Sequence, residues 1–255
     1  MLISTDKGSG PVVVFLHAFP LDRRMWLGQI ESLADMYRVI APDLPGFGDS
    51  PLLAQPSIDA FADQVAEHLD EKNITQPVTL VGLSMGGYVA LAFARRQPHR
   101  LAGLVLADTK ALPDDSAARA QRDQMIALVS RAGVTALVDT MLPKLLGAST
   151  QRTQPEVVAA TRQLASSQRS EGVLAALQAL RDRPDATPHL QQIAVPTLVL
   201  VGEEDTITPP SVAQSLAQAI PGARLVVIPQ AGHLANAENP TAFNDGLLTF
   251  LTGVG

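Results

Sequence analysis

The chain of 255 residues contains no cysteine. This absence excludes disulfide bonds and thiolate metal sites, and it is compatible with a reducing compartment. No run of about 18 consecutive apolar residues occurs, so no transmembrane helix is expected. The first ten residues include no apolar stretch as long as that of a signal peptide. We therefore expect a soluble cytoplasmic protein.

An excess of positive charge is also missing, since the net charge is −6. A mildly acidic balance argues against binding to nucleic acid or to an anionic membrane surface. Internal repeats, low-complexity segments and charge runs are absent as well. What is present is a hydrophobic fraction of 46%, enough for one large α/β domain with an inserted subdomain.

Short apolar runs rich in β-branched residues alternate with segments of helical periodicity. The strands expected from these runs span 12–16, 38–43, 78–83, 101–107, 196–202 and 223–229, and residues 2–5 are expected to form a short edge strand. Such alternation predicts a doubly wound, mostly parallel sheet of seven to eight strands, in the α/β class. In such a sheet the ligand site lies outside the carboxyl ends of the strands.

The strand signal disappears between about Lys110 and Pro188. Helices are expected there over 115–131, 134–142, 155–167 and 171–181. We therefore expect residues 1–109 and 189–255 to form the core, and residues 110–188 to form an inserted α-helical cap.

The most informative stretch is Gly82-Leu83-Ser84-Met85-Gly86, placed between a predicted strand and a predicted helix. A serine at so sharp a strand-to-helix turn projects its hydroxyl from the end of the sheet. Glycines flank it because side chains at those positions would clash where strand and helix nearly touch. The pattern predicts that Ser84 is a nucleophile rather than part of an inert tight turn. An acid and then a base must follow it along the chain.

The base is predicted to be His233, in a loop just past the last predicted strand. A histidine there can take the proton of Ser84 and return it to the leaving group. His68 and His99 are expected to be solvated, and His189 to be structural.

The acid is predicted to be Asp205, which follows the penultimate strand. Asp108, at the end of the strand before the helical insertion, is the alternative. Glu203 and Glu204 are expected to be solvated loop charges.

An oxyanion hole needs two N–H donors aimed at the developing alkoxide. The residue after the nucleophile, Met85, supplies one. The loop after the first strong strand supplies the other, and Phe19 is best placed for it.

Five ordered motifs together resemble the α/β-hydrolase superfamily over essentially the whole chain. They are His17-Ala18-Phe19-Pro20, Asp43-Leu44-Pro45-Gly46-Phe47-Gly48-Asp49-Ser50, Gly82-Leu83-Ser84-Met85-Gly86-Gly87, Gly202-Glu203-Glu204-Asp205 and Ala231-Gly232-His233. The resemblance implies the same nucleophile, acid, base and oxyanion donors, with no cofactor and no metal. Two departures stand out: Ala18 replaces the usual glycine of the oxyanion loop, and the short N-terminus leaves the first of the usual eight strands absent or vestigial.

Within the superfamily the chain resembles small carboxylesterases and 3-oxoadipate enol-lactonases. A serine at the elbow speaks against haloalkane dehalogenases and epoxide hydrolases, which place aspartate there. Prolyl aminopeptidases need acidic cap residues for a free amine, whereas Asp114, Asp115, Glu156 and Glu171 suit solvated helix faces.

The expected substrate is a small-molecule ester or lactone, cleaved through an acyl-enzyme. A slow-turnover sensor that keeps the hydrolase fold is the alternative from another functional class.

Overall fold

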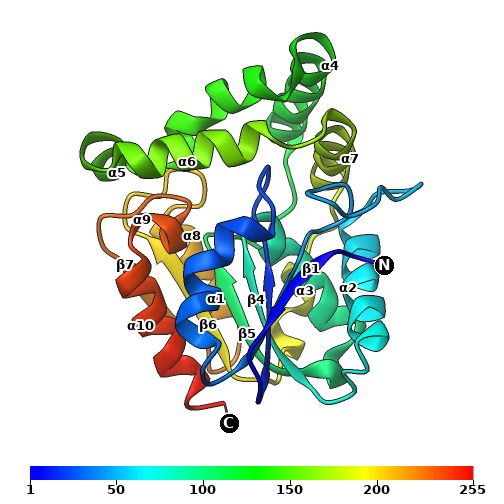
Figure 1. Cartoon of the computed structure of the whole chain (residues 1–255), viewed down its shortest axis with the longest axis vertical. Helices are drawn as coiled ribbons and strands as arrows, with labels where there is room; N and C mark the ends of the chain where they lie inside the picture. Colours follow the sequence, from blue (N-terminus) through cyan, green and yellow to red (C-terminus); the bar gives the residue numbers. More distant parts are fainter. Residues whose placement is uncertain (255) are drawn as a thin grey trace.

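The computed structural model describes residues 1–254, and within them seven strands form one sheet (Figure 1). The strand order is β1-β3-β2-β4-β5-β6-β7. The strands are β1 (Ser4–Lys7), β2 (Val12–Leu16), β3 (Arg38–Pro42), β4 (Val78–Leu83), β5 (Leu101–Ala107), β6 (Thr197–Gly202) and β7 (Arg224–Ile228). Only the edge pairing of β1 with β3 is antiparallel. The predicted doubly wound, mostly parallel sheet is confirmed, with seven strands.

Helices cover both faces of this sheet. Right-handed crossovers place α1 (Leu27–Leu33) on one face and α2 (Ile58–Glu71), α3 (Met85–Arg96) and α8 (Pro210–Ala219) on the other. The closing helix α10 (Pro240–Leu251) lies beside α1 (Figure 1). Strands β2, β4 and β6 are consequently buried along their whole length, which explains why they read as continuous apolar runs rather than alternating patterns.

Shorter helical segments connect these elements. They are the 3₁₀ turns η1 (Arg23–Trp26), η2 (Pro98–Arg100) and η3 (Thr187–Gln192), and the one-turn helix α9 (Ala235–Glu238).

The insertion between β5 and β6 is helical, as expected. It contains α4 (Ser116–Leu145), α5 (Ala148–Thr153), α6 (Pro155–Ser166) and α7 (Ser170–Arg181). These helices form a layer above the carboxyl ends of the strands, at the top of the view in Figure 1. The short α5 was not among the helices predicted from the sequence.

Helix α4 is the one helix in residues 1–254 that meets the length and hydropathy expected of a membrane span. It is not a continuous rod, however, because Gly133 inside it adopts φ 80° and ψ 177°. The two parts on either side of Gly133 are each shorter than the roughly 20 residues that a bilayer requires. Helix α4 packs on the neighbouring cap helices α6 and α7.

The sheet has its topological switch point between β2 and β4. The chain leaves β2 toward β3 on one side and leaves β4 toward β5 on the other. Leu16 at the end of β2 pairs with Gly82 near the end of β4. A crevice at this point is where open α/β sheets bind ligands, so the loops after these two strands become the place to look for chemistry.

Candidate active site

Ser84 occupies the tight turn between β4 and α3. Its φ of 54° and ψ of −111° are unusual for a residue with a side chain. A Cβ on Gly82 would overlap the carbonyl of Gly86, and one on Gly86 would overlap the carbonyl of Leu16. The two glycines therefore let the chain reverse directly against β2, and the strained serine is held at the switch point.

The structure brings Ser84, His233 and Asp205 into one hydrogen-bonded chain. The Oγ of Ser84 lies 2.8 Å from Nε2 of His233. The Nδ1 of the same imidazole lies 2.8 Å from Oδ2 of Asp205. His233 and Asp205 are only 2% and 3% exposed. A buried carboxylate that accepts from Nδ1–H leaves Nε2 free to accept the serine proton.

Thr208 completes the environment of Asp205. Its hydroxyl donates to Oδ2 at 2.6 Å, and the amides of Ile207 and Thr208 donate to Oδ1 at 2.8 and 3.0 Å. Burial alone would raise the pKa of Asp205, but the His233 imidazole and the bonds from Thr208 outweigh burial and lower it. The carboxyl is thus kept as an anion beside the imidazole. Thr208 was not identified from the sequence, although amides two and three residues after an aspartate are typical Asx-turn donors.

The alternative acid, Asp108, is not bonded to the imidazole. Its Oδ1 accepts from the amide of Gly202 at 2.8 Å, while no residue among 1–254 donates to its buried Oδ2. Burial raises the pKa of Asp108 well above its ordinary value, and the nearby charge of Asp205 adds to this. Burial and the neighbouring charge of Asp205 thus favour the protonated form of Asp108.

The amides of Phe19 and Met85 have no acceptor among residues 1–254. Met85 is the first residue of α3, where a helix leaves its N–H groups unpaired. Phe19 lies in the loop after β2, at the neighbouring strand end. Two free donors on adjacent strand ends are what an oxyanion site requires.

His17 fixes the loop that carries Phe19. Its Nε2 accepts from the amide of Leu44 at 2.8 Å, so Nδ1 carries the proton and donates to the carbonyl of Ala18 at 3.0 Å. Burial lowers the pKa of His17 and keeps the ring neutral. The methyl group of Ala18, which replaces the glycine of the usual motif, is fully buried.

Two glutamates join the cap to the loops that hold the acid and the base. Glu238 is 3% exposed and accepts from the amides of Gly147 at 2.7 Å and Leu234 at 3.0 Å. Glu204, predicted to be a solvated charge, instead accepts from the amide and the hydroxyl of Ser149 at the start of α5. No pattern in the sequence pointed to either contact, because each joins segments far apart in the chain.

The cap is also attached to the loop after β2. The side-chain amide of Gln168 donates to Asp22 at 2.7 Å, and its carbonyl oxygen accepts from the amide of Gly48 at 3.1 Å. Gln168 lies in the turn between α6 and α7. Hydrogen bonds to cap residues therefore hold both the loops after β2 and β3 and the loops that carry Asp205 and His233.

Two other expectations for titratable residues were wrong. His68 is buried rather than solvated, with its Nε2 3.0 Å from the hydroxyl of Ser4. Asp114 is buried between Arg122 and Arg183 rather than on a solvated helix face.

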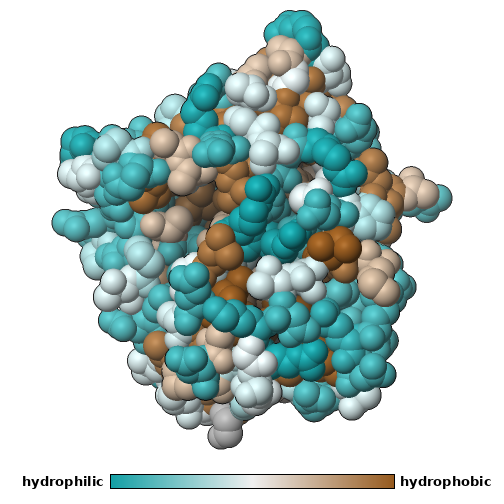
Figure 2. Space-filling view, viewed as in Figure 1, coloured by the Kyte–Doolittle hydropathy of each residue, from teal (hydrophilic) through white to brown (hydrophobic). Residues whose placement is uncertain are grey.

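An apolar groove of about 570 Å³ opens between α6 and the core. Figure 2 shows apolar surface gathered in this hollow beneath the cap. Its apolar lining comprises Leu21, Met25, Val157, Leu164, Leu234 and Ala237. Since Leu234 follows His233 and Leu21 lies two residues after Phe19, the groove lies beside the loops that carry the base and the free amide.

The sequence matches a family of known proteins along most of its length. The family model for the alpha/beta hydrolase fold matches residues 11–240. A 3-oxoadipate enol-lactonase 2 of Acinetobacter baylyi is 31% identical over 92% of this chain and 86% of its own. A pimeloyl-[acyl-carrier protein] methyl ester esterase of Chromobacterium violaceum is 33% identical over 89% of this chain and 88% of its own.

Among solved structures, a malate-bound thermophilic esterase from Thermogutta terrifontis superimposes with a TM-score of 0.96. It is 43% identical, covering 99% of this chain and 93% of its own.

Proposed function

This chain belongs to the alpha/beta hydrolase fold family, and on that premise we propose that it is a serine hydrolase of small carboxylic esters. The observation that carries the proposal is the Ser84–His233–Asp205 hydrogen-bonded chain, with two unpaired amides beside it. Relatives named as esterases, one of them 43% identical, support the reaction class.

In the proposed reaction Oγ of Ser84 attacks the ester carbonyl while Nε2 of His233 takes its proton. The negative charge that develops on the carbonyl oxygen is stabilised by the amides of Phe19 and Met85. Asp205 orients the imidazole and stabilises the imidazolium. The tetrahedral intermediate collapses as His233 passes the proton to the departing alcohol, leaving an acyl group on Ser84.

The second half of the reaction reverses these roles. A water molecule gives its proton to His233 and attacks the acyl carbon, and the same two amides stabilise the new oxyanion. Collapse breaks the bond to Oγ, which regains its proton from the imidazole. The products are one carboxylic acid and one alcohol.

The apolar groove beneath α6 supports an ester with at least one hydrocarbon substituent. Its lining of leucine, valine and methionine side chains offers few hydrogen-bonding groups. Such a surface binds an acyl or alcohol chain by removing apolar area from water.

Replacement of the nucleophile tests the proposal. Ser84→Ala should abolish steady-state hydrolysis of p-nitrophenyl butyrate while leaving the circular dichroism spectrum and the Tm near those of the wild type. Full turnover by this variant would refute the assignment. Ser32→Ala, which removes a hydroxyl from α1, serves as the matched control and should retain activity.

Enol-lactone hydrolysis is the second candidate, and the enol-lactonase relative at 31% identity favours it. In a lactone the alcohol and the acid remain in one molecule after ring opening, so the substrate must fit the site as a ring. A panel of linear esters from acetate to decanoate, with one enol-lactone, separates the two candidates by kcat/KM.

The same preparation distinguishes an enzyme from a sensor. An enzyme continues to release p-nitrophenol in the steady state, whereas a slow-turnover sensor stops after about one equivalent per chain.

A further inference from the structure

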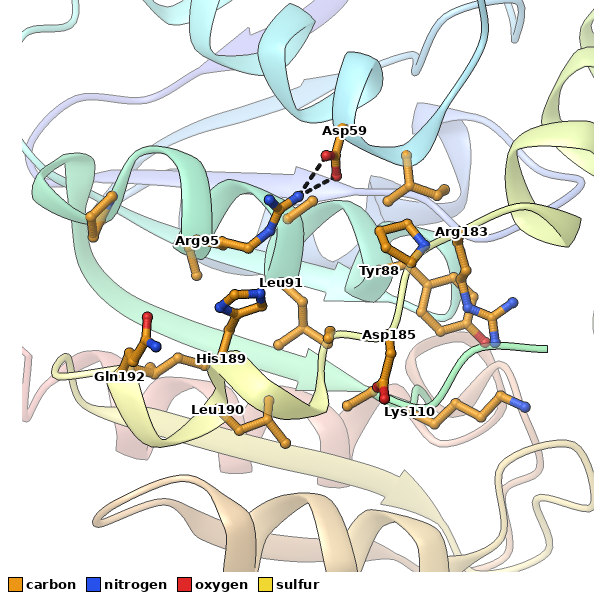
Figure 3. A pocket seen from close by; sticks show the side chains of 18 residues that line it. Asp59, Tyr88, Leu91, Arg95, Lys110, Arg183, Asp185, His189, Leu190 and Gln192 are labelled. Atoms are coloured by element: carbon orange, nitrogen blue, oxygen red, sulfur yellow. Dashed lines mark hydrogen bonds and ion pairs between the residues drawn. The ribbon is translucent and has the colours of Figure 1, made fainter. Parts of the chain in front are cut away.

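A second cavity lies between α3 and the segment that returns the chain from α7 to β6 (Figure 3). Its volume is about 770 Å³ when the open mouth is included. None of Ser84, Asp205 and His233 lines it. The cavity is therefore separate from the proposed catalytic chain.

The middle of this cavity is apolar. Leu91 and Ala92 of α3 and Leu190 and Ile193 of the return segment are among its lining residues, and Figure 3 shows Leu91 on α3 above the return segment that carries Leu190. These side chains offer contact to a short hydrocarbon body and no hydrogen bonds.

One end of the cavity carries more positive than negative charge. Three cations share the single carboxylate of Asp114: Nη1 of Arg183 lies 2.7 Å from it, Nε of Arg122 3.0 Å and Nζ of Lys110 3.9 Å. The distance for Lys110 is that of a weak pairing. Lys110 and Arg183 both line the cavity.

Arg183 also has an unused donor. Its guanidinium lies over the ring of Tyr88 at 4.2 Å, and Nη1 and Nη2 donate to Asp114, Leu180 and Leu112. Its Nε–H is buried and has no acceptor among residues 1–254. A buried donor without an acceptor is unfavourable, and an incoming anion would satisfy it.

The surroundings of Lys110 also favour a bound anion. Burial, followed by the charge of Arg183, lowers the pKa of Lys110. An anion bound between the two cations would oppose both effects.

The cavity is lined by three further charged groups and one histidine. Arg95 donates to both oxygens of Asp59 at 2.6 Å, which neutralises that end (Figure 3). Asp185 is exposed and accepts from the amide of Thr187 at 2.9 Å. His189 is the last titratable group in the lining. Lys110 and Arg183 are therefore the cations of the lining that are not paired with Asp59.

We propose that this cavity is a second ligand site for a small carboxylate with a short hydrocarbon chain. The hydrocarbon chain packs on the apolar part of the lining, which includes Leu91 and Ala92, and the carboxylate accepts from Nζ of Lys110 and Nε of Arg183. Charge-assisted hydrogen bonds of this kind are the stronger class in proteins. The site rests on the chemistry of its own lining and not on the proposed esterase activity.

The test is calorimetric titration of the intact protein with hexanoate. Wild type should bind one equivalent at this site, and hexanamide, which has the same shape without the charge, should bind at least tenfold more weakly. Lys110→Met keeps the aliphatic stem but removes the ammonium, and it should weaken hexanoate binding at least tenfold. Lys144→Met, on the exposed surface of the cap, is the matched control and should bind hexanoate as wild type does.

A second variant keeps the test decisive if Lys110→Met does not fold. Ala186→Trp, at a half-buried lining position, should fill the cavity and abolish the same binding event. Equal hexanoate affinity in wild type and in either folded variant would overturn the proposal, as would the absence of saturable binding to wild type. Hydrolysis of p-nitrophenyl butyrate, measured in parallel, reports separately on the triad.

Discussion

Asp108 and Asp205 follow neighbouring parallel strands, yet their surroundings shift the pKa values of their carboxyl groups in opposite directions. Asp205 receives an imidazole N–H, a hydroxyl and two amides. Asp108 receives the amide of Gly202 on one oxygen and lies buried beside the Asp205 charge. The number and direction of hydrogen-bond donors, rather than depth of burial alone, account for these opposite pKa shifts.

This difference predicts the behaviour of Asp108→Asn. The raised pKa of Asp108 means that the unfolded chain loses this proton at lower pH than the folded chain, so stability falls as pH rises above the ordinary value of 3.8. Asparagine has no proton to lose, keeps an oxygen for the amide of Gly202, and tolerates the φ of 44°. The variant should therefore gain stability over wild type increasingly as the pH rises above 4, until the carboxyl of Asp108 ionises in the folded state, with activity retained. Urea unfolding across this range measures it, and a pH-independent difference would contradict it.

Glu238 predicts a second effect at a single residue. One carboxylate accepts from Leu234, next to the base, and from Gly147 of the cap. Glu238→Gln turns one acceptor into a donor facing an N–H, so the loop of His233 should shift by a fraction of an ångström. We expect kcat for p-nitrophenyl butyrate to fall about tenfold with KM within twofold, since misplacement by about 1 Å can cost roughly 10²-fold.

The control for Glu238→Gln is Glu203→Gln, an exposed glutamate in the loop after β6. It should leave kcat and KM within twofold of wild type. A rise in KM with kcat unchanged in Glu238→Gln would assign this residue to substrate binding instead of positioning the base.

Sequence reasoning succeeded at the residue scale where local geometry dictates the residue type. Ser84 is recognisable because a strained turn between Gly82 and Gly86 has few other uses, and the structure shows that turn. The contacts of Glu238 and Gln168 were not predicted because their partners lie in distant segments. A single glutamate or glutamine in a sequence does not indicate which distant residue it will contact.

At the scale of single elements, the interruption of α4 was anticipated and the presence of α5 was not. The gap between the predicted helices 115–131 and 134–142 falls at Gly133, where the backbone leaves the helical region. The six residues of α5 lack apolar periodicity, and the carboxylate of Glu204 holds the first turn of this helix. A helix that depends on a tertiary contact cannot be found from its own sequence pattern.

Two glycine-to-alanine substitutions test this view of the elements. Gly28 lies in α1 with no atom within 4 Å of an added Cβ, and alanine there should raise the free energy of unfolding by about 0.5–1 kcal/mol. An added Cβ at Gly133 would also have no atom within 4 Å, but the φ there is 80°. Alanine at this position should therefore lower the free energy of unfolding by about 1–3 kcal/mol. Thermal unfolding should show Tm shifts of opposite sign, and a stabilising Gly133→Ala would mean that α4 can become continuous.

On the scale of the whole molecule, the cap and the sheet share one core. Val138 and Leu177 of the cap belong to the same buried cluster as the strands. The cap is tied to the core at one edge by Glu204 and Glu238 and at the other by Gln168. The sequence predicted that the insertion is helical, but these anchoring points could not be read from it, since they depend on where the cap is placed over the sheet.

These ties predict that the cap and the sheet unfold together. Trp26, the only tryptophan, is fully buried in the core between Phe15 and Phe243, so its fluorescence reports on the core alone. Far-UV circular dichroism reports on all helices, including those of the cap. In equilibrium urea unfolding the two signals should give the same midpoint and the same slope, as a single cooperative transition requires. Loss of helical signal at lower urea, with tryptophan fluorescence unchanged, would instead make the cap an independent unit, held by Glu238 and Gln168 only loosely enough to open while the sheet stays intact.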